Sequence, residues 1–257
     1  MYTDLTRPAL RAAQLQRALG PDGWRVEVRD SVDSTNALVE DRARGGEPAG
    51  LVVVAEHQRA GRGRQDRAWV SPPRAGLTFS VLLTPSTATD AVPALGWVPL
   101  FGGLAVATAL REVAGVPAVL KWPNDVLARE RKICGVLARS PGAGVVVLGI
   151  GLNVTTRSEE LPDERASSLQ LAGATTTDRG LLLRAVLRTL KGILEQPERS
   201  AVAYRELCAT LGRQVRLELP GGSSRTGTAD AVDDDGRLVV DGAPYSAGDV
   251  VHLRGAD

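Results

Sequence analysis

The apolar stretch at residues 96–113 constrains the fold of this chain more than any other part of the sequence. It is apolar almost all round, and a helix without a polar face is stable in water only when it is buried. Gly102 and Gly103 lie near its middle and would let a neighbouring element approach the helix backbone closely. We therefore expect a buried helix here, packed under a sheet.

Short apolar runs bounded by Gly, Pro, Asn and Asp predict that sheet. The expected strands are residues 25–29, 51–55, 76–83, 118–122, 126–128, 133–138 and 145–150. Further helices are expected at residues 8–19, between a cluster of capping residues at 33–36 and Gly45, and in two pieces between residues 178 and 211 that are broken at Pro197. The fold class is therefore α+β, a mixed β-sheet backed by helices.

The composition changes after Gly212. Residues 215–219, 226–232, 238–241 and 250–253 are short apolar runs separated by turns rich in Gly and Asp. Strands this short, with turns this regular, are typical of a small β-barrel. We expect a larger domain at residues 1–211 and a small barrel domain at residues 212–257.

Composition and charge exclude several classes of protein. The 257 residues are 43% hydrophobic and 24% charged, which is enough for one sizeable core and argues against disorder. A formal net charge of +1 argues against broad, phosphate-driven binding of nucleic acid. Cys134 and Cys208 are far apart, as are His57 and His252, so we identify no metal ligands among the side chains. No signal peptide or membrane-spanning run is visible, and we expect a reducing cytoplasm.

Residues 61–69 read Gly-Arg-Gly-Arg-Gln-Asp-Arg-Ala-Trp and follow the expected strand at 51–55. Guanidinium groups offer planar, paired donors that suit phosphates and carboxylates, and glycine lets the backbone approach a ligand. Trp69 could cover a flat ring. The segment predicts an anion-binding loop, and an ordinary exposed turn rich in arginine is the alternative.

Residues 121–125 read Lys-Trp-Pro-Asn-Asp, a lysine and a carboxylate presented together in a chain with only three lysines. If residues 126–128 and 133–138 pair as a hairpin, Asp125 and Lys132 end near the same sheet edge. Gly135 would then let a ligand lie flat against that strand. The alternative is a structural turn followed by a solvated lysine.

Other motifs are weaker or absent. Ser34, Thr35 and Asn36 could hydrogen-bond a neutral polar ligand, but they are also ordinary helix-capping residues. Residues 149–154 read Gly-Ile-Gly-Leu-Asn-Val and lack the third glycine and following helix of a dinucleotide fingerprint, although Asn153 can still face a site. The sequence has no P-loop and no Gly-x-Ser-x-Gly motif.

Five motifs in order resemble those of the biotin protein ligases. They are Ser34-Thr35-Asn36, the stretch from Glu56-His57-Gln58 to Trp69, Lys-Trp-Pro-Asn-Asp at 121–125, Lys-Ile-Cys-Gly-Val-Leu at 132–137 and Gly-Ile-Gly-Leu-Asn at 149–153. The resemblance spans about residues 31–154. It implies a catalytic domain of the class II aminoacyl-tRNA synthetase and biotin ligase type, followed by an SH3-like barrel.

The resemblance also implies a two-step reaction. The carboxylate of biotin attacks the α-phosphate of ATP and gives biotinyl-5′-adenylate and pyrophosphate, with Mg²⁺ assisting the triphosphate. A lysine of the biotin carboxyl carrier protein of a biotin-dependent carboxylase then takes the biotinyl group as an amide. Arginine side chains suit the first step, because two anions must meet in it.

The site residues are implied by the same resemblance. The implied catalytic residues are Arg62, Arg64, Lys132 and Asp125. The implied biotin contacts are Ser34, Thr35, Asn36, Gln58, Arg62, Gly63, Arg64, Lys132 and Gly135. The implied contacts to ATP or the adenylate are Arg64, Arg67, Trp69, Lys121, Asn124, Lys132 and Asn153.

The adenylate is a mixed anhydride that water would destroy, so a loop closing over it would protect it. We predict that residues 60–73 are mobile without ligand and ordered with the adenylate. Arg139 stands where family members often carry glutamate, which puts the local contacts in question. Only 33 residues precede Ser34, too few for a winged helix-turn-helix, so DNA binding is not expected.

Two rival functions stay open from the sequence. A lipoate or octanoate transferase would share the catalytic fold, with a pocket suited to an apolar acyl chain. A non-enzymatic RNA-binding protein could use the Gly-Arg segment, but an aromatic content of 4% and the near-zero net charge argue against stacking platforms and basic grooves.

Overall fold

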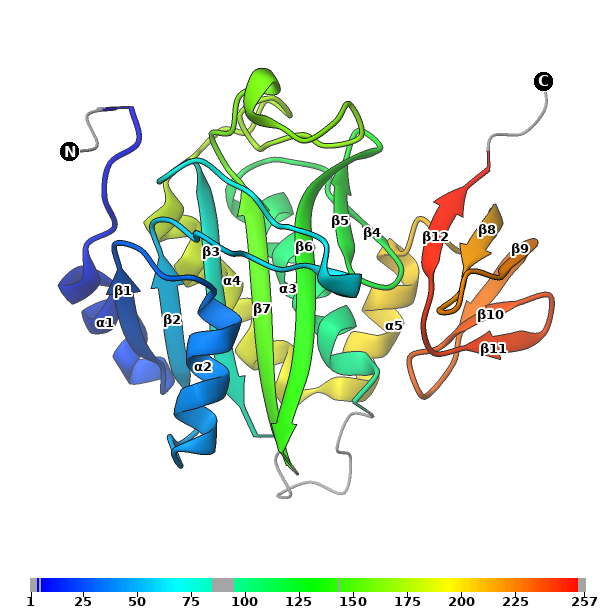
Figure 1. Cartoon of the computed structure of the whole chain (residues 1–257), viewed down its shortest axis with the longest axis horizontal. Coiled ribbons are helices and arrows are strands. Elements are labelled where there is room, and N and C mark those ends of the chain that lie inside the picture. The colour runs from blue at the N-terminus through cyan, green and yellow to red at the C-terminus, as the bar shows by residue number, and fades with distance from the viewer. Residues whose placement is uncertain (1–3, 5, 85–94, 143, 254–257) are drawn as a thin grey trace.

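The computed structural model describes residues 4, 6–84, 95–142 and 144–253, and its centre is a seven-stranded sheet (Figure 1). The strands are β1 (Arg25–Arg29), β2 (Leu51–Ala55), β3 (Gly76–Leu83), β4 (Val119–Lys121), β5 (Asp125–Ala128), β6 (Arg131–Gly142) and β7 (Val145–Asn153). They run in the order β1-β2-β3-β7-β6-β5-β4. Among these seven strands of the described residues, β1 and β2 are the one parallel pair, which confirms the predicted mixed sheet.

Helices cover both faces of this sheet. They are α1 (Ala12–Leu19), α2 (Thr35–Arg44), α3 (Trp97–Val113), α4 (Arg179–Glu195) and α5 (Pro197–Leu207), with 3₁₀ turns η1 (Gly20–Asp22), η2 (Arg64–Asp66) and η3 (Ser158–Glu160). In Figure 1, α3, α4 and α5 lie behind the sheet and α2 lies in front of it. The front face also holds the arginine segment, so α2 and that segment share one surface.

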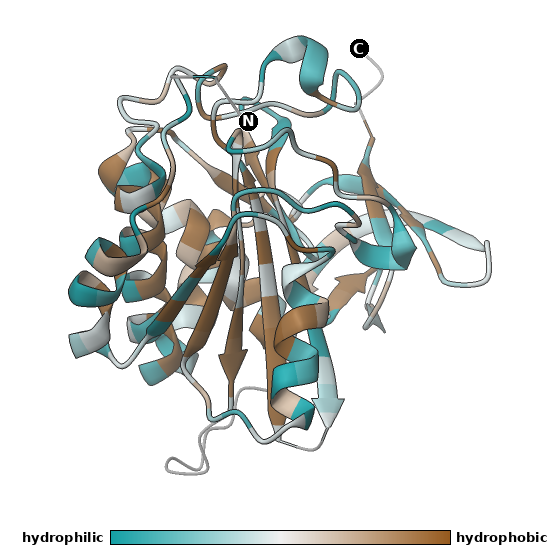
Figure 2. Cartoon of the chain, turned by 60° about the vertical axis from the view of Figure 1, so that its left-hand side comes forward, coloured by the Kyte–Doolittle hydropathy of each residue, from teal (hydrophilic) through white to brown (hydrophobic). Residues whose placement is uncertain are grey.

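Helix α3, which the sequence predicted at residues 96–113, is buried as expected. Twelve residues of α3 are buried, from Trp97 to Leu110. A Cβ atom added to Gly102 would lie 3.1 Å from side-chain carbons of Val136 and Leu148, so only glycine fits without a shift. Figure 2 shows the apolar strands in the middle of the molecule and polar residues on the outer helices.

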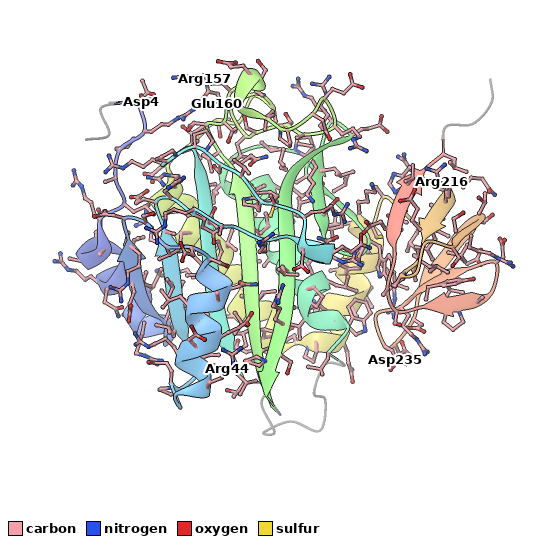
Figure 3. All side chains as sticks on the ribbon, viewed as in Figure 1. Asp4, Arg44, Arg157, Glu160, Arg216 and Asp235 are labelled. Carbon is pink, nitrogen blue, oxygen red and sulfur yellow. The ribbon has the colours of Figure 1, made fainter. Side chains whose placement is uncertain are left out.

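The N-terminal helix begins later than predicted, at Ala12 rather than at residue 8. Buried polar groups hold the preceding residues in another path: Leu10 N donates to Glu56 Oε1 at 2.6 Å, and Arg179 Nη2 donates to Pro8 O at 2.6 Å. Arg7 pairs with Glu160 at 2.6 Å, near Asp4 and Arg157 in Figure 3. The helix can therefore start only where these contacts end.

Strands β6 and β7 extend beyond the predicted ranges, to Gly142 and Asn153. In β6 the predicted strand ended before the exposed Arg139 and Ser140, where pairing with β7 continues to Gly142 although burial stops. In β7 the predicted strand ended before Gly151, although residues 151–153 are buried and paired with β3.

The C-terminal part forms a second, five-stranded antiparallel sheet. Its strands are β8 (Gln214–Glu218), β9 (Ser224–Val232), β10 (Leu238–Val240), β11 (Ala243–Tyr245) and β12 (Asp249–His252), in the order β11-β10-β9-β8-β12. Among the described residues β11 and β12 do not pair, so the sheet does not close into the barrel that the sequence predicted. Strand β11 was missed because it contains Pro244, which lacks a backbone donor and is tolerated at a sheet edge.

Two tryptophans attach the second sheet to the larger part of the molecule: Trp97 lies at the start of α3, and Trp122 directly follows β4. Trp97 Nε1 donates to Asp234 O at 2.8 Å, and Trp122 Nε1 donates to Gly236 O at 3.0 Å. Apolar side chains of both sheets belong to one continuous core, including Leu217 and Leu238. The attachment brings β12 beside the edge of the main sheet that carries β4 and β5 (Figure 1).

Candidate functional site

Residues 61–69 form a short hairpin, which we call the arginine hairpin. Gly63 N donates to Arg67 O at 2.7 Å, and Trp69 N donates to Gly61 O at 2.9 Å. The turn residues Gln65 and Asp66 have φ values of 52° and 54°, in the left-handed region that costs non-glycine residues energy. In Figure 1 the segment crosses in front of β7 and β6 and points toward β12. Its predicted ordering on ligand binding stays a prediction.

Two glycines of the sheet form a floor under Trp69. A Cβ atom on Gly151 would lie 2.5 Å from the Trp69 ring, and one on Gly135 would lie 3.1 Å from it. Lys132 Nζ lies 5.7 Å from the ring centroid on the same surface. Gly135, predicted to let a ligand lie flat, therefore holds the indole ring in this structure. The indole Nε1 is buried and has no hydrogen-bond partner among the described residues.

A second group of side chains, the hydroxyl–amide network, consists of Thr35, Asn36, Gln58 and Ser80. Thr35 N and Oγ1 donate to Gln58 Oε1 at 2.7 and 3.0 Å. Ser80 Oγ lies within hydrogen-bonding distance of Thr35 Oγ1, at 2.7 Å, and of Asn36 Oδ1. Asn36 packs over Gly149, where a Cβ atom would clash with it. The network is neutral and internally bonded.

The sequence left two interpretations of Ser34, Thr35 and Asn36 open, and the structure separates them. Ser34 is the N-cap of α2, and its Oγ accepts from Ala37 N at 3.4 Å. Thr35 and Asn36 occupy the first turn and are buried against the sheet. Capping therefore explains Ser34, whereas the next two residues belong to the network.

The predicted hairpin of β5 and β6 is confirmed, and it brings Lys132 and Asp125 together. Lys132 Nζ lies 2.6 Å from Asp125 Oδ1, although the angles do not make a hydrogen bond. Lys121 lies on β4, directly opposite Asp125 in the strand pairing. Burial lowers the pKa of Lys121, and the nearby Asp125 carboxylate opposes that shift.

The hairpin arginines have different surroundings. Arg64 Nη1 donates to Asn124 Oδ1 at 3.3 Å and to Gly248 O at 3.1 Å. Burial lowers the pKa of Arg64, with the Asp249 carboxylate opposing the shift. Arg67 Nη2 pairs with Asp249 Oδ2 at 2.6 Å. Arg64 is therefore held by residues of both parts of the molecule, whereas Arg67 is held by the C-terminal sheet.

Other predicted residues lie at the margin of this group. Arg62 Nη1 donates to Asp66 O at 3.2 Å on the exposed side of the hairpin. Asn153 is buried, and its Nδ2 donates to Ser167 O at 2.9 Å. Because Ser167 N donates to Lys132 O at 2.8 Å, Asn153 braces the backbone beside Lys132. Arg139 Nη2 lies 3.7 Å from Asp66 Oδ1 at the hairpin tip.

Sequence reasoning missed two members of the site. Ser80 is fully buried on β3, and a signal existed, because Thr78 and Ser80 alternate with apolar residues in an otherwise apolar strand. Asp249 comes from β12, 182 positions after Arg67, and nothing in its local sequence points to the hairpin.

The described residues contain no group of three or more His, Cys, Asp or Glu side chains that could hold a metal ion. Asp125 is paired with Lys132, and Asp249 with Arg67, so both carboxylates already face cations. Such a donor set does not fit a protein-held Mg²⁺, which prefers several oxygen ligands. Cys134 and Cys208 are buried and free, and burial raises the pKa of both thiols.

The fold and this site define the class of protein. Residues 28–154 match the model of the biotin/lipoate A/B protein ligase family, and residues 210–253 match that of the biotin protein ligase C-terminal domain. The biotin–[acetyl-CoA-carboxylase] ligase of Mycobacterium tuberculosis is 41% identical and covers 98% of each chain. The chain belongs to the biotin protein ligase family.

Further relatives agree with this assignment. The bifunctional ligase/repressor BirA of Escherichia coli is 32% identical over 92% of this chain and 76% of its own length. The biotin protein ligase of Aquifex aeolicus, solved with biotin and ATP, covers 90% of this chain and 99% of its own, with 29% identity and a TM-score of 0.71. The Leishmania major ligase with biotinyl-5-AMP has 25% identity, covers 90% and 99%, and has a TM-score of 0.63.

Proposed function

We infer that this protein is an ATP-dependent ligase that activates biotin as biotinyl-5′-adenylate and transfers it to a lysine of a biotin carboxyl carrier protein. The observation that carries the inference is the shared surface of a neutral, buried network and a cationic hairpin, which meet where Gln58 packs against Gly61, in a chain of this family. Relatives solved with biotin and ATP, or with biotinyl-5-AMP, support the same pair of substrates.

The two parts of the site suit the two parts of the first product. The hydroxyl–amide network offers neutral donors and acceptors, which match an uncharged ureido ring. Arg62, Arg64, Arg67 and Lys132 offer positive charge, which offsets repulsion between the biotin carboxylate and the α-phosphate. A carboxylate oxygen forms the new bond to phosphorus while pyrophosphate leaves.

In the second step the carrier lysine attacks the acyl carbon and AMP leaves. The attacking amine must be neutral, so one proton has to be removed from the ammonium group. Asp125 Oδ1, which lies 2.6 Å from Lys132 Nζ and makes no hydrogen bond among the described residues, is the proposed acceptor of that proton. The nitrogen loses a second proton as the amide forms, and that proton goes to the phosphate of the departing AMP. A carboxylase carrier domain is the proposed partner, in keeping with the name of the M. tuberculosis relative.

The ligand contacts are proposed residue by residue. Ser34, Thr35, Asn36, Gln58, Gly63 and Gly135 are assigned to biotin; Arg67, Trp69, Lys121, Asn124 and Asn153 to ATP or the adenylate; and Arg62, Arg64 and Lys132 to the reacting groups. The hydroxyl of Ser34 caps α2, so the assignment of Ser34 to biotin is supported only by its position next to Thr35 of the network. Mg²⁺ would be held by the triphosphate oxygens, because the donor set does not fit a protein-held ion.

Three broader assignments complete the proposal. The chain is divided into a catalytic part at residues 1–211 and a C-terminal part at residues 212–257. Its location is the cytoplasm, and no DNA contact is part of its function. None of the helices in the described ranges is long and apolar enough to cross a membrane.

Recovery of the adenylate tests the function. Incubation with ATP and radiolabelled biotin should yield labelled adenylate and pyrophosphate, and radiolabelled lipoate should yield neither. Arg64→Ala should reduce the rate of adenylate formation by about 10²- to 10³-fold. Lipoyl-adenylate in place of biotinyl-adenylate would assign the chain to the other branch of the family, and no adenylate from either acid would reject the function.

The proposed ordering of residues 60–73 has its own test. Biotin and ATP together should slow amide hydrogen exchange in this segment, because closure over the adenylate excludes water. Equal exchange with and without the two substrates would contradict a closing loop while leaving the ligase activity intact.

A further inference from the structure

The carboxylate of Asp249 lies where the hairpin arginines would meet a substrate anion. Its Oδ2 is 2.6 Å from Arg67 Nη2, and its Oδ1 is 3.6 Å from Arg64 Nη1. Asp249 begins β12 in the C-terminal sheet, whereas the arginines belong to the hairpin over the main sheet. One negative charge therefore bridges the two parts of the molecule.

The two arginines are not held equally. Arg64 is 19% exposed and also donates to Asn124 and to the backbone oxygen of Gly248. Arg67 is 61% exposed, and its link to Asp249 is an ion pair at the surface, a kind that is weak and easily replaced. Loss of the carboxylate would leave Arg64 in position and free the charge of Arg67.

An open groove of about 810 Å³ adjoins this contact. Its lining includes Arg64, Arg216, Glu218 and Asp249, so a ligand in it meets both the hairpin and the C-terminal sheet. Arg216 is labelled on the C-terminal sheet in Figure 3. The groove therefore has space for a polyanion beside the arginines that pair with Asp249.

We propose that Asp249 is an internal competitor for the substrate phosphates: it pairs with Arg64 and Arg67 until the triphosphate of ATP displaces it, and it pairs with them again as pyrophosphate leaves. This inference rests on the proposed function. A polyphosphate brings several charges to the guanidinium groups, whereas Asp249 brings one. Displacement also breaks the side-chain link between the hairpin and Asp249, so anion binding and loosening of β12 are linked, although Arg64 keeps its contact with Gly248 O.

The direction in which pyrophosphate affinity changes in one variant shows whether Asp249 competes with the substrate phosphates or positions the arginines. If Asp249 competes, Asp249→Asn should bind inorganic pyrophosphate about 3- to 10-fold more tightly, because an exposed ion pair of this kind is modest in strength. If Asp249 instead holds the arginines in a productive position, the same variant should bind pyrophosphate more weakly. Calorimetry with pyrophosphate alone measures this without biotin or catalysis.

Glu218→Gln is the matched control. Glu218 lies directly opposite Asp249 in the pairing of β8 with β12 and lines the same groove, but it pairs with Arg216 at 3.1 Å. Its substitution removes an equal charge and frees Arg216 rather than a hairpin arginine, so it measures what a freed cation of the groove outside the hairpin contributes. Pyrophosphate affinity within twofold of wild type is expected for Glu218→Gln, and Asp249→Glu should bind less tightly than Asp249→Asn.

Amide hydrogen exchange provides a second test, because a purely structural role of Asp249 predicts no change in exchange when pyrophosphate binds. Pyrophosphate should speed amide exchange at residues 248–252 in the wild-type protein and change it little in Asp249→Asn, where the link is already broken. Equal or weaker pyrophosphate binding by Asp249→Asn, or an equal gain in Glu218→Gln, would overturn the proposal. Absence of adenylate formation by the wild-type protein would instead refute the proposed function, and the calorimetric comparison would still stand.

Discussion

The hydroxyl–amide network and the arginine hairpin lie on the same face of one sheet, yet they are built in opposite ways. Thr35, Asn36 and Ser80 are buried and satisfy one another through hydrogen bonds. The hairpin is charged, and Arg67 reaches its carboxylate partner at the surface. One region is preorganised, whereas the other keeps its charges in contacts that a ligand can replace.

This difference follows from the cost of losing a partner. A buried hydroxyl or amide left without a hydrogen bond loses about 1–3 kcal/mol, so the network has to keep its arrangement when a ligand arrives. An exposed ion pair contributes about 0–1 kcal/mol, so exchanging one anion for another is easy. A site for a neutral group is therefore best built from buried hydrogen bonds that stay in place. A site for a polyphosphate is best built from exposed charges that can change partners.

The largest expected effect is at Lys132, which lies beside the base of the arginine hairpin. Lys132→Ala removes the cation beside Asp125 and Trp69, and the rate of adenylate formation should fall about 10²- to 10³-fold because charge developing at phosphorus loses a donor. Lys191→Ala is the control, since Lys191 Nζ donates to Asp22 O far along the chain from the site. Pyrophosphate release from labelled ATP measures both rates, and equal losses would mean that the wrong lysine has been chosen.

Ser80→Ala tests the preorganised region alone. Thr35 and Asn36 lose a shared partner, so the free energy of unfolding should fall by about 1–3 kcal/mol and the KM for biotin should rise about tenfold. The KM for ATP should stay within twofold. Urea unfolding and steady-state kinetics measure these values, with Ser140→Ala on the exposed part of β6 as control. An equal rise in both KM values would show that the two regions are not separate.

The same contrast explains how much the sequence could predict. The β5–β6 hairpin and the meeting of Asp125 with Lys132 were predictable, because they depend on neighbouring strands and a short turn. The position of Asp249 was not, because it depends on how Trp97 and Trp122 fasten the C-terminal sheet to the main one. Sequence rules that act between neighbouring residues can predict a single hairpin. Contacts between two sheets depend on how the sheets pack against each other.

The expectations for Gly135 and for the C-terminal barrel can also be compared with the structure. The sequence predicted that a ligand lies against Gly135; in the structure Trp69 lies over this glycine, and the contact between Gly135 and biotin stays a prediction. The predicted barrel is an open sheet in the described residues because the strand at Pro244 pairs on one side.

Gly151→Ala should produce an intermediate effect. The new methyl carbon would lie 2.5 Å from the Trp69 ring, so the ring has to move and the hairpin base moves with it. We expect the KM for ATP to rise about 3- to 10-fold, which corresponds to roughly 1 kcal/mol. Gly142→Ala is the control, because nothing lies within 4 Å of an added Cβ there. Unchanged kinetics in Gly151→Ala would mean that the position of Trp69 does not matter for ATP.

The smallest expected effect is a pH dependence of stability at His252, which lies on β12 near the hairpin contacts. Thr210 Oγ1 accepts from Trp122 N at 3.1 Å and lies 3.1 Å from His252 Nε2, so its own proton is available to a neutral imidazole. Burial, followed by the positive charges of Lys121 and Arg213, lowers the pKa of His252 from 6.5 to about 4. The folded protein therefore resists protonation of this ring.

Below pH 6.5 the unfolded chain takes up a proton at His252 that the folded chain refuses until about pH 4. The free energy of unfolding should therefore be fully retained above pH 6.5 and fall as the pH drops through this window. Because the ring is only half buried, the loss should be about 1 kcal/mol rather than the full value of the shift. Urea unfolding of the wild type and of His252→Gln at several pH values isolates this contribution from that of the carboxylates. A constant difference between the two proteins from pH 7 to pH 4.5 would show that His252 is protonated equally in the folded and unfolded states.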